Sequence, residues 1–154
     1  MIPLDWIRHL PEKQYSSGEQ IVTKGLDHDC LFFLKSGKVE VVRDGYRITL
    51  IKTPGSVLGE MSVLLKLPAT ADVVATEEVS CHVAENPMDF LRQHPDIAVQ
   101  VGVALAYRVD AATKYLVDVK EQMKDCSDHV GMVDGVLDAI VHRDVKKKLP
   151  LHTE

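Results

Sequence analysis

The chain lacks paired cysteines and long apolar runs, and each absence excludes a class of protein. Its three cysteines, Cys30, Cys81 and Cys126, are scattered and form no Cys-x-x-Cys pair. A disulfide framework is therefore excluded, and reduced thiols in a cytoplasmic protein are expected. No stretch of about eighteen apolar residues exists, and the N-terminus has no basic-then-apolar pattern, so we expect neither a membrane span nor a signal peptide.

A surplus of positive charge is also missing. Lysine and arginine number 18 against 23 acidic residues, which gives a net charge of -5. Binding to a nucleic-acid backbone needs a basic face, so we expect no nucleic-acid partner. The lysine run 146–148 could touch acidic lipid or nucleic acid, but a solvated cluster at a helix C-terminus is the simpler interpretation. The seven histidines, including His28, His82 and His94, show no metal-ligand spacing, so we expect scattered positions and no metal site.

What is present is a series of short, alternating strands. Hydrophobic content of 45% and charged content of 27% are ordinary for a globular protein, and 154 residues can form a sizeable core. Val39 and Val41 alternate with charged residues, Asp44-Gly45 favours a tight hairpin, and apolar residues alternate again along 46–50. Further short strands, 73–75 and 79–83, flank a Thr-Glu-Glu turn. This spacing predicts an antiparallel sandwich or barrel.

The last third of the chain has helical patterns. Asn86-Pro87 predicts a helix start with Asn as the cap and Pro at the first position, and His94-Pro95 starts another helix. From about Ile97 to Lys124 an apolar stripe repeats every three or four residues: Val101, Leu105, Val109, Ala112, Leu116, Val119 and Met123. The stripe either packs on the chain's own barrel or pairs two subunits, and we expect a homodimer. A terminal amphipathic helix is expected over 130–149.

One segment carries the clearest chemical pattern. After the turn at Pro54-Gly55, Gly59-Glu60 opens a short apolar helix over 61–65. Amides at a helix start suit an anion, glycine allows close approach to the backbone, and a glutamate can accept hydrogen bonds from sugar hydroxyls. Without further context, Glu60 would be an acidic residue in a first helical turn. Ser62 lies nearby, but no histidine base is suggested for it, so we expect no enzyme.

This segment, followed by Pro68-Ala69-Thr70-Ala71, resembles the phosphate-binding cassette of cyclic-nucleotide-binding domains. The family's form is Gly-Glu-hydrophobic-small-Leu-Leu, a spacer, then Pro-Arg-Ala/Thr-Ala. The stretches 15–22, 24–29 and 31–41 are similar to its preceding strands and turns, so the resemblance spans roughly residues 12–92. It implies a mainly β fold, an antiparallel jelly roll of the double-stranded β-helix type with flanking helices. The expected domains are 1–96 for the jelly roll with a short N-terminal helix, 97–124 for a lid or dimerisation helix, and 130–149 for the terminal helix.

The resemblance also implies a ligand, cAMP or cGMP, and its site. Glu60 would bind the ribose, and the amides of 59–62 and 69–71 would bind the phosphate. Thr70 stands where cGMP-preferring members often carry threonine. The expected ligand-binding residues are Val57, Leu58, Gly59, Glu60, Met61, Ser62, Ala69, Thr70 and Ala71.

One residue departs from the family pattern. Ala69 stands where the family has the arginine that holds the cyclic phosphate. Loss of a charge-assisted contact worth about 1.5–3 kcal/mol, normally bidentate, could weaken binding by roughly two orders of magnitude. Lys66 or Arg108 would compensate in part if either pointed inward.

The resulting hypothesis is a stand-alone regulatory or sensor module that acts through dimer geometry or an unknown protein partner. The alternative is a degenerate docking module that binds no cyclic nucleotide. A DNA-binding regulator of the catabolite-activator class is disfavoured, because only about thirty residues follow Met123 and the net charge is negative.

Overall fold

The computed structural model describes residues 1–124 and 127–142, and the chain divides into two compact units, Met1–Ala104 and Leu105–Glu154. The elements of the first unit are α1 (Leu4–Ile7), β1 (Glu12–Tyr15), β2 (Gln20–Val22), β3 (Leu31–Ser36), β4 (Val39–Arg43), β5 (Tyr46–Ile51), β6 (Val57–Leu58), α2 (Glu60–Leu65), β7 (Asp72–Ala75), β8 (Val79–Ala84) and α3 (Pro87–Gln93). Helix α4 (Pro95–Gln122) continues from the first unit into the second, which also holds α5 (Ser127–His142). The domain division expected from the sequence stays a prediction.

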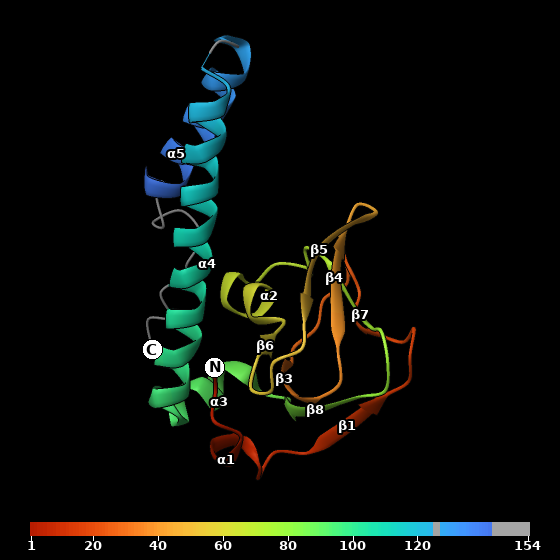
Figure 1. The fold of residues 1–154 in the computed structure, drawn as a ribbon. Helices are drawn as coiled ribbons and strands as arrows, with labels where there is room; N and C mark the ends of the chain where they lie inside the picture. Colours follow the sequence, from red (N-terminus) through yellow and green to blue (C-terminus); the bar gives the residue numbers. More distant parts are fainter. Residues whose placement is uncertain (125–126, 143–154) are drawn as a thin grey trace. The chain divides into compact units, whose positions relative to one another are not determined.

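Eight strands form two four-stranded antiparallel sheets (Figure 1). The first sheet has the order β1-β8-β3-β6 and the second has the order β2-β7-β4-β5. Strands that follow one another in sequence mostly lie in different sheets, so the chain crosses repeatedly from one sheet to the other. Only β4 and β5 are paired sequence neighbours, and their turn contains Asp44 and Gly45 at φ 52° and 82°. This is the predicted jelly roll, and the predicted hairpin turn is confirmed with it.

The core of the first unit lies between the two sheets. Strand β8 is buried along its whole length, and apolar side chains from both sheets form one cluster: Tyr15, Val22, Phe32, Leu34, Val39, Leu58, Ala69, Val73, Ala75, Val79, Cys81 and Val83. On β3 the alternate side chain Phe33 points the other way and packs on Phe90 of α3, with ring centroids 5.9 Å apart. Burial of this apolar surface is the main favourable contribution to the stability of the fold.

Two local expectations differ from the structure. Strand β5 lies at the edge of its sheet, and its apolar residues Tyr46, Ile48 and Leu50, which alternate with polar ones, are exposed rather than buried in the core. Asn86 does occupy the N-cap position of α3, with Pro87 at the first turn, but its side chain makes no capping hydrogen bond.

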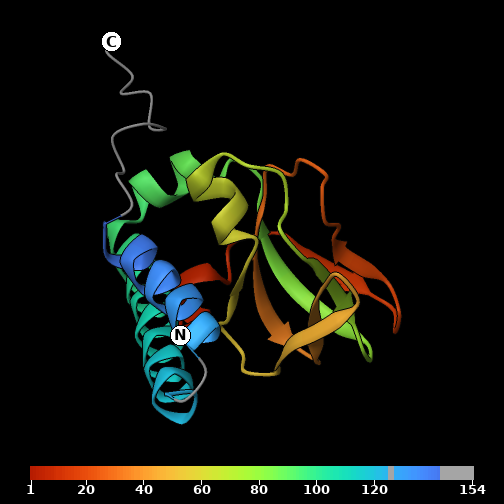
Figure 2. The same ribbon diagram turned by 90° about the horizontal axis from the view of Figure 1, so that it is seen from above.

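The second unit is a pair of helices. Within it, α5 lies beside the later part of α4 in both views (Figures 1 and 2), and Lys120 of α4 forms an ion pair with Asp134 of α5. Its half-buried apolar side chains are Leu105, Leu116, Val119, Met123, Val133 and Leu137, whereas Val109 is exposed. The end of the expected terminal helix, 143–149, and the lysine run 146–148 lie outside the described residues. In the part of the chain that the structure describes, no helix has the length and apolar character that a membrane span requires.

Candidate functional site

The turn that leads into the cassette is held by backbone contacts on two sides. The N–H of Gly55 donates to the carbonyl oxygen of Leu34 at 2.7 Å, and the N–H of Ile2 donates to the carbonyl oxygen of Gly55 at 3.1 Å. Gly55 has φ +83°, and a Cβ there would lie 2.0 Å from the Ile2 carbonyl oxygen. Only glycine fits this position, because a side chain would require both a rare backbone conformation and a clash. The turn feeds directly into β6, which pairs with β3.

Helix α2 begins where the sequence predicted. Gly59 is its N-cap, with φ 84° in the left-handed region, and Val63 donates its N–H to the Gly59 carbonyl oxygen at 3.3 Å. Lys66 is the C-cap at φ 52°, and its side chain is exposed. A helix of six residues is about 9 Å long. Lys66 therefore caps the end of α2 that lies away from the first-turn amides.

The polar residues of α2 are turned inward. Glu60 is 4% exposed and Ser62 is 7% exposed, whereas Met61 between them is 44% exposed. Burying a carboxylate is costly unless polar groups surround it. A buried glutamate at this position therefore indicates a polar surrounding that stabilises it, unlike a solvated first-turn residue. The structure thus brings together the buried residues Val57, Leu58, Glu60 and Ser62 with the half-buried Gly59 in one segment.

The second half of the cassette has a different character. Ala69 is 4% exposed and belongs to the apolar cluster between the sheets, while Thr70 and Ala71 are half-buried. The N–H of Ala69 donates to the carbonyl oxygen of Leu26 at 3.0 Å, and its carbonyl oxygen accepts the N–H of Gly25 at 2.8 Å. Residue 69 therefore supplies no charge, and its backbone N–H is already used by a neighbouring loop.

That loop, residues 23–30 between β2 and β3, bridges the two halves of the cassette. Besides its two bonds to Ala69, it donates the N–H of Lys24 to Oδ1 of Asp72 at 2.8 Å. At its other end, the ring of His28 lies against Gly59: its Cε1 is 2.7 Å from where a Cβ on Gly59 would stand. The carbonyl oxygen of Cys30 is 3.2 Å from the same point. The bridging loop thus touches both the Gly-Glu segment and residue 69.

His28 is a cassette neighbour that the sequence-based reasoning missed. We grouped it with scattered histidines, but its imidazole lies at Gly59 and is tilted against Phe32, with ring centroids 6.2 Å apart. Both ring nitrogens are shielded from solvent and have no hydrogen-bond partner among the residues that the structure describes. The available signal was its place in the 25–29 turn, which belongs to the stretch that resembles the family's preceding strands and turns.

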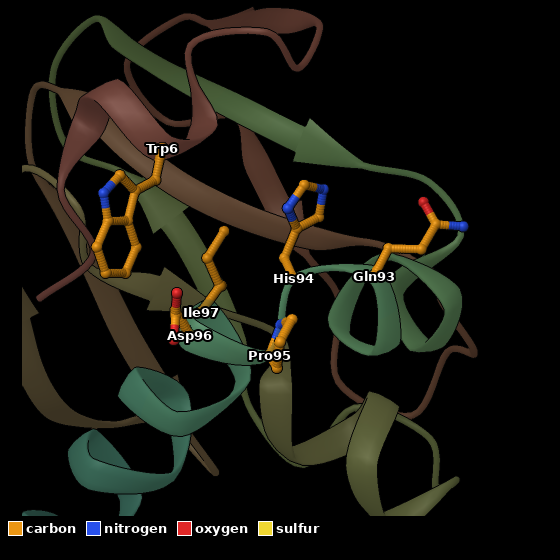
Figure 3. A pocket seen from close by; sticks show the side chains of 6 residues that line it. All are labelled: Trp6, Gln93, His94, Pro95, Asp96 and Ile97. Atoms are coloured by element: carbon orange, nitrogen blue, oxygen red, sulfur yellow. The ribbon is translucent and has the colours of Figure 1, made fainter.

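A separate pocket of about 310 Å³ lies in the first unit, where α1, the end of α3 and the start of α4 meet (Figure 3). It is lined by Trp6, Gln93, His94, Pro95, Asp96 and Ile97, none of which the sequence predicted as a site residue. The His94 ring stacks near Phe90, with centroids 4.6 Å apart. Among residues 1–124 and 127–142, no three histidine, cysteine or acidic side chains form a group able to hold a metal ion.

The chain is similar in sequence and fold to known proteins. Residues 12–93 match the model of the cyclic nucleotide-binding domain family. A cAMP-dependent protein kinase regulatory subunit from Yarrowia lipolytica is 38% identical over 71 residues, which cover 46% of this chain and 19% of the relative. Glutaminase 2 from Bradyrhizobium diazoefficiens is 35% identical over 109 residues, covering 65% of this chain and 17% of the relative.

The structure of the Thermus thermophilus catabolite activator protein superposes with a TM-score of 0.65 at 27% identity, covering 75% of this chain and 58% of that one. The chain spans less than a fifth of the length of the two curated relatives above. The family match covers the jelly roll and its cassette, the same part in which Gly59 and the buried Glu60 open α2. The chain therefore belongs to the cyclic nucleotide-binding domain family.

Proposed function

We propose that this chain is a regulatory module that binds a cyclic nucleotide, cAMP or cGMP, at the cassette formed by 57–62 and 69–71. The observation that carries the proposal is Gly59 at φ +84° opening α2, with the carboxylate of Glu60 buried beside it. The printed name of the Yarrowia lipolytica relative, a cAMP-dependent protein kinase regulatory subunit, supports cAMP as one of the two candidates. Members of this family are regulatory domains and are generally not catalytic.

The contacts would be divided between the two halves of the cassette. Glu60 accepts hydrogen bonds from the ribose hydroxyls, and the backbone amides in the first turn of α2 donate to the cyclic phosphate. The N–H of Ala69 donates to Leu26, so this amide contributes only if the bridging loop moves. The phosphate contact expected from the family arginine is missing. Binding is therefore weaker than in members that carry it, by roughly two orders of magnitude.

The module would form a homodimer through α4 and would signal to a protein partner whether its ligand is bound. Leu105, Leu116, Val119 and Met123 remain half-buried and Val109 is exposed in the single chain, so this stripe keeps apolar surface that a second copy could cover. Free thiols at Cys30 and Cys81 support a reducing, cytoplasmic location.

Titration calorimetry tests the proposal directly. The purified protein is titrated with cAMP, cGMP and a cyclic dinucleotide, with non-cyclic 5′-AMP as the control for adventitious nucleotide binding. We expect saturable binding of cAMP or cGMP, and we expect Glu60→Ala to weaken it by removing the ribose acceptor. If millimolar cyclic nucleotide gives neither heat nor a shift in melting temperature, the docking-module alternative replaces this proposal.

A further inference from the structure

The imidazole of His28 is in an unusual environment for a polar group. Neither Nδ1 nor Nε2 is exposed to solvent, and neither has a hydrogen-bond partner within the described part of the chain. Buried polar side chains are nearly always hydrogen-bonded, because leaving water without a new partner is unfavourable. Two unpaired nitrogens on one ring therefore suggest that the partner of His28 is not among residues 1–124 and 127–142.

The position of the ring indicates what that partner is. His28 lies against Gly59, at the start of the segment whose amides would bind a cyclic phosphate. The loop that carries it is tied to residue 69 by two backbone hydrogen bonds, so a single loop joins the position of the missing arginine to the Gly-Glu segment. Charged groups of both signs lie on this loop: Asp27 and Asp29 are exposed, and Lys24 is paired with Asp44 of the β4–β5 turn. Glu60 follows Gly59.

We propose that His28 is a ligand-contacting residue that supplies the phosphate with a donor in place of the arginine that Ala69 replaces. The inference rests on the proposed function and names one further residue of that site. When the cyclic nucleotide binds, the imidazole rotates away from Phe32, and one ring N–H donates to a phosphate oxygen. An imidazole carries at least one N–H donor in either protonation state, and a phosphate oxygen is an acceptor. The contact satisfies a nitrogen that is unpaired in the ligand-free chain.

A purely structural role predicts something different. If His28 only filled the space over Gly59, a ring of similar size without nitrogens would fill it equally well and leave binding unchanged. His28→Phe makes that replacement. Because it removes two buried unpaired nitrogens, it should raise the melting temperature of the ligand-free protein by a few degrees. If the proposal holds, the same variant should bind the cyclic nucleotide about tenfold to a hundredfold more weakly.

The experiment combines calorimetry with melting curves on the full chain. His28→Phe and His28→Gln are compared with wild type, and His9→Gln serves as the control, because His9 is exposed and packs near Phe90 and His94, away from the cassette. We expect the order of affinity wild type, His28→Gln, His28→Phe, with His9→Gln equal to wild type. In imidazole NMR spectra, the His28 signals should shift on addition of cAMP or cGMP, while those of His82, whose Nδ1 lies 3.3 Å from the carbonyl oxygen of Leu10, stay in place.

The outcomes separate the two proposals. Wild-type binding with equal affinity in His28→Phe, or with unchanged His28 signals, overturns the role of His28 and leaves the proposed function intact. No binding of either nucleotide by wild type overturns both. Weaker binding together with a higher melting temperature in His28→Phe supports the ligand contact and contradicts a role in packing alone.

Discussion

The ring of His28 lies against Gly59 on the side where any other residue would carry its Cβ, with Cε1 2.7 Å from that point. Glycine at this position of the motif suggests close approach by a ligand. Here, a side chain of the same protein makes use of the missing Cβ, and the left-handed φ of +84° adds a second reason for glycine. The glycine is therefore required by the ligand-free fold, independently of any nucleotide.

The first prediction concerns this pair. Gly59→Ala should destabilise the protein by about 1–3 kcal/mol, because it combines a strained backbone with a contact that forces the His28 ring to move. The free energy of unfolding is measured by urea denaturation. Gly18→Ala is the matched control: Gly18 has φ +86°, but an added Cβ would have nothing within 4 Å.

The difference between the two variants isolates the clash. Gly18→Ala should lower the free energy of unfolding only through backbone strain. His28→Ala in the Gly59→Ala background should recover much of the additional loss of stability seen at Gly59. Equal losses at Gly18 and Gly59 would contradict the contact between Gly59 and His28.

The second prediction places the missing charge back in the cassette. Ala69→Arg should strengthen cyclic-nucleotide binding about tenfold to a few hundredfold, since a bidentate charge-assisted contact is worth a few kcal/mol before ordering costs. Residue 69 lies in the apolar cluster between the sheets. The ligand-free variant should therefore be less stable, on the order of 3 kcal/mol, and the ligand should restore its melting temperature.

Two variants control for this result. Ala69→Met adds length without charge, and it should lower stability without any gain in affinity. Glu60→Ala in the Ala69→Arg background should reverse much of the gain. A folded Ala69→Arg protein that binds no better than wild type would show that the pocket differs from the family at more than one residue.

The third prediction concerns the thiols. Burial raises the pKa of the Cys81 thiol to about 12, and burial also raises the pKa of Cys30. Since the thiolate is the reactive form, Cys81 should resist alkylation at pH 8 unless the protein unfolds, and Cys30 should react more slowly than a free thiol. Mass spectrometry of a Cys126→Ser variant, with and without denaturant, measures the alkylation rates of Cys81 and Cys30. Rapid labelling of Cys81 in the folded protein would contradict its burial.

The same shift implies a dependence of stability on pH. The folded pKa of Cys81 is above the unfolded value near 9, so the unfolded chain loses its proton first as the pH rises. The stabilising contribution of the protonated Cys81 thiol is fully present below about pH 8.5 and is lost progressively toward pH 12. Cys81→Ala should flatten this alkaline decline, as followed by thermal melts in steps of pH.

The fourth prediction concerns assembly. Glutamates at both Leu116 and Val119 place charge in the apolar stripe of α4 and should convert a dimer into monomers, as measured by light scattering. Val117→Glu is the control, since Val117 is 49% exposed and lies outside the stripe. Circular dichroism checks that the helices persist. A wild-type protein that is monomeric at high micromolar concentration would overturn the homodimer.

Local patterns predicted much of the fold, but not its long-range contacts. The Asp44-Gly45 turn and the start of α2 at Gly59 follow from residues close in sequence, and both are confirmed. The exposure of Ile48 was mispredicted, because alternation identifies a strand but not whether a second layer covers it. The place of His28 was missed for a similar reason: it depends on a contact across about thirty residues of sequence.

The bond between Ile2 and Gly55 has a practical consequence for anyone who works with this domain. The family match begins at residue 12, yet the N–H of residue 2 holds the carbonyl of the turn that precedes the cassette. Ile2 is itself 3% exposed, so the first residues support the turn that precedes the cassette. A protein trimmed to the matched segment would lose that support. Binding experiments should therefore use a protein that keeps residues 1–11.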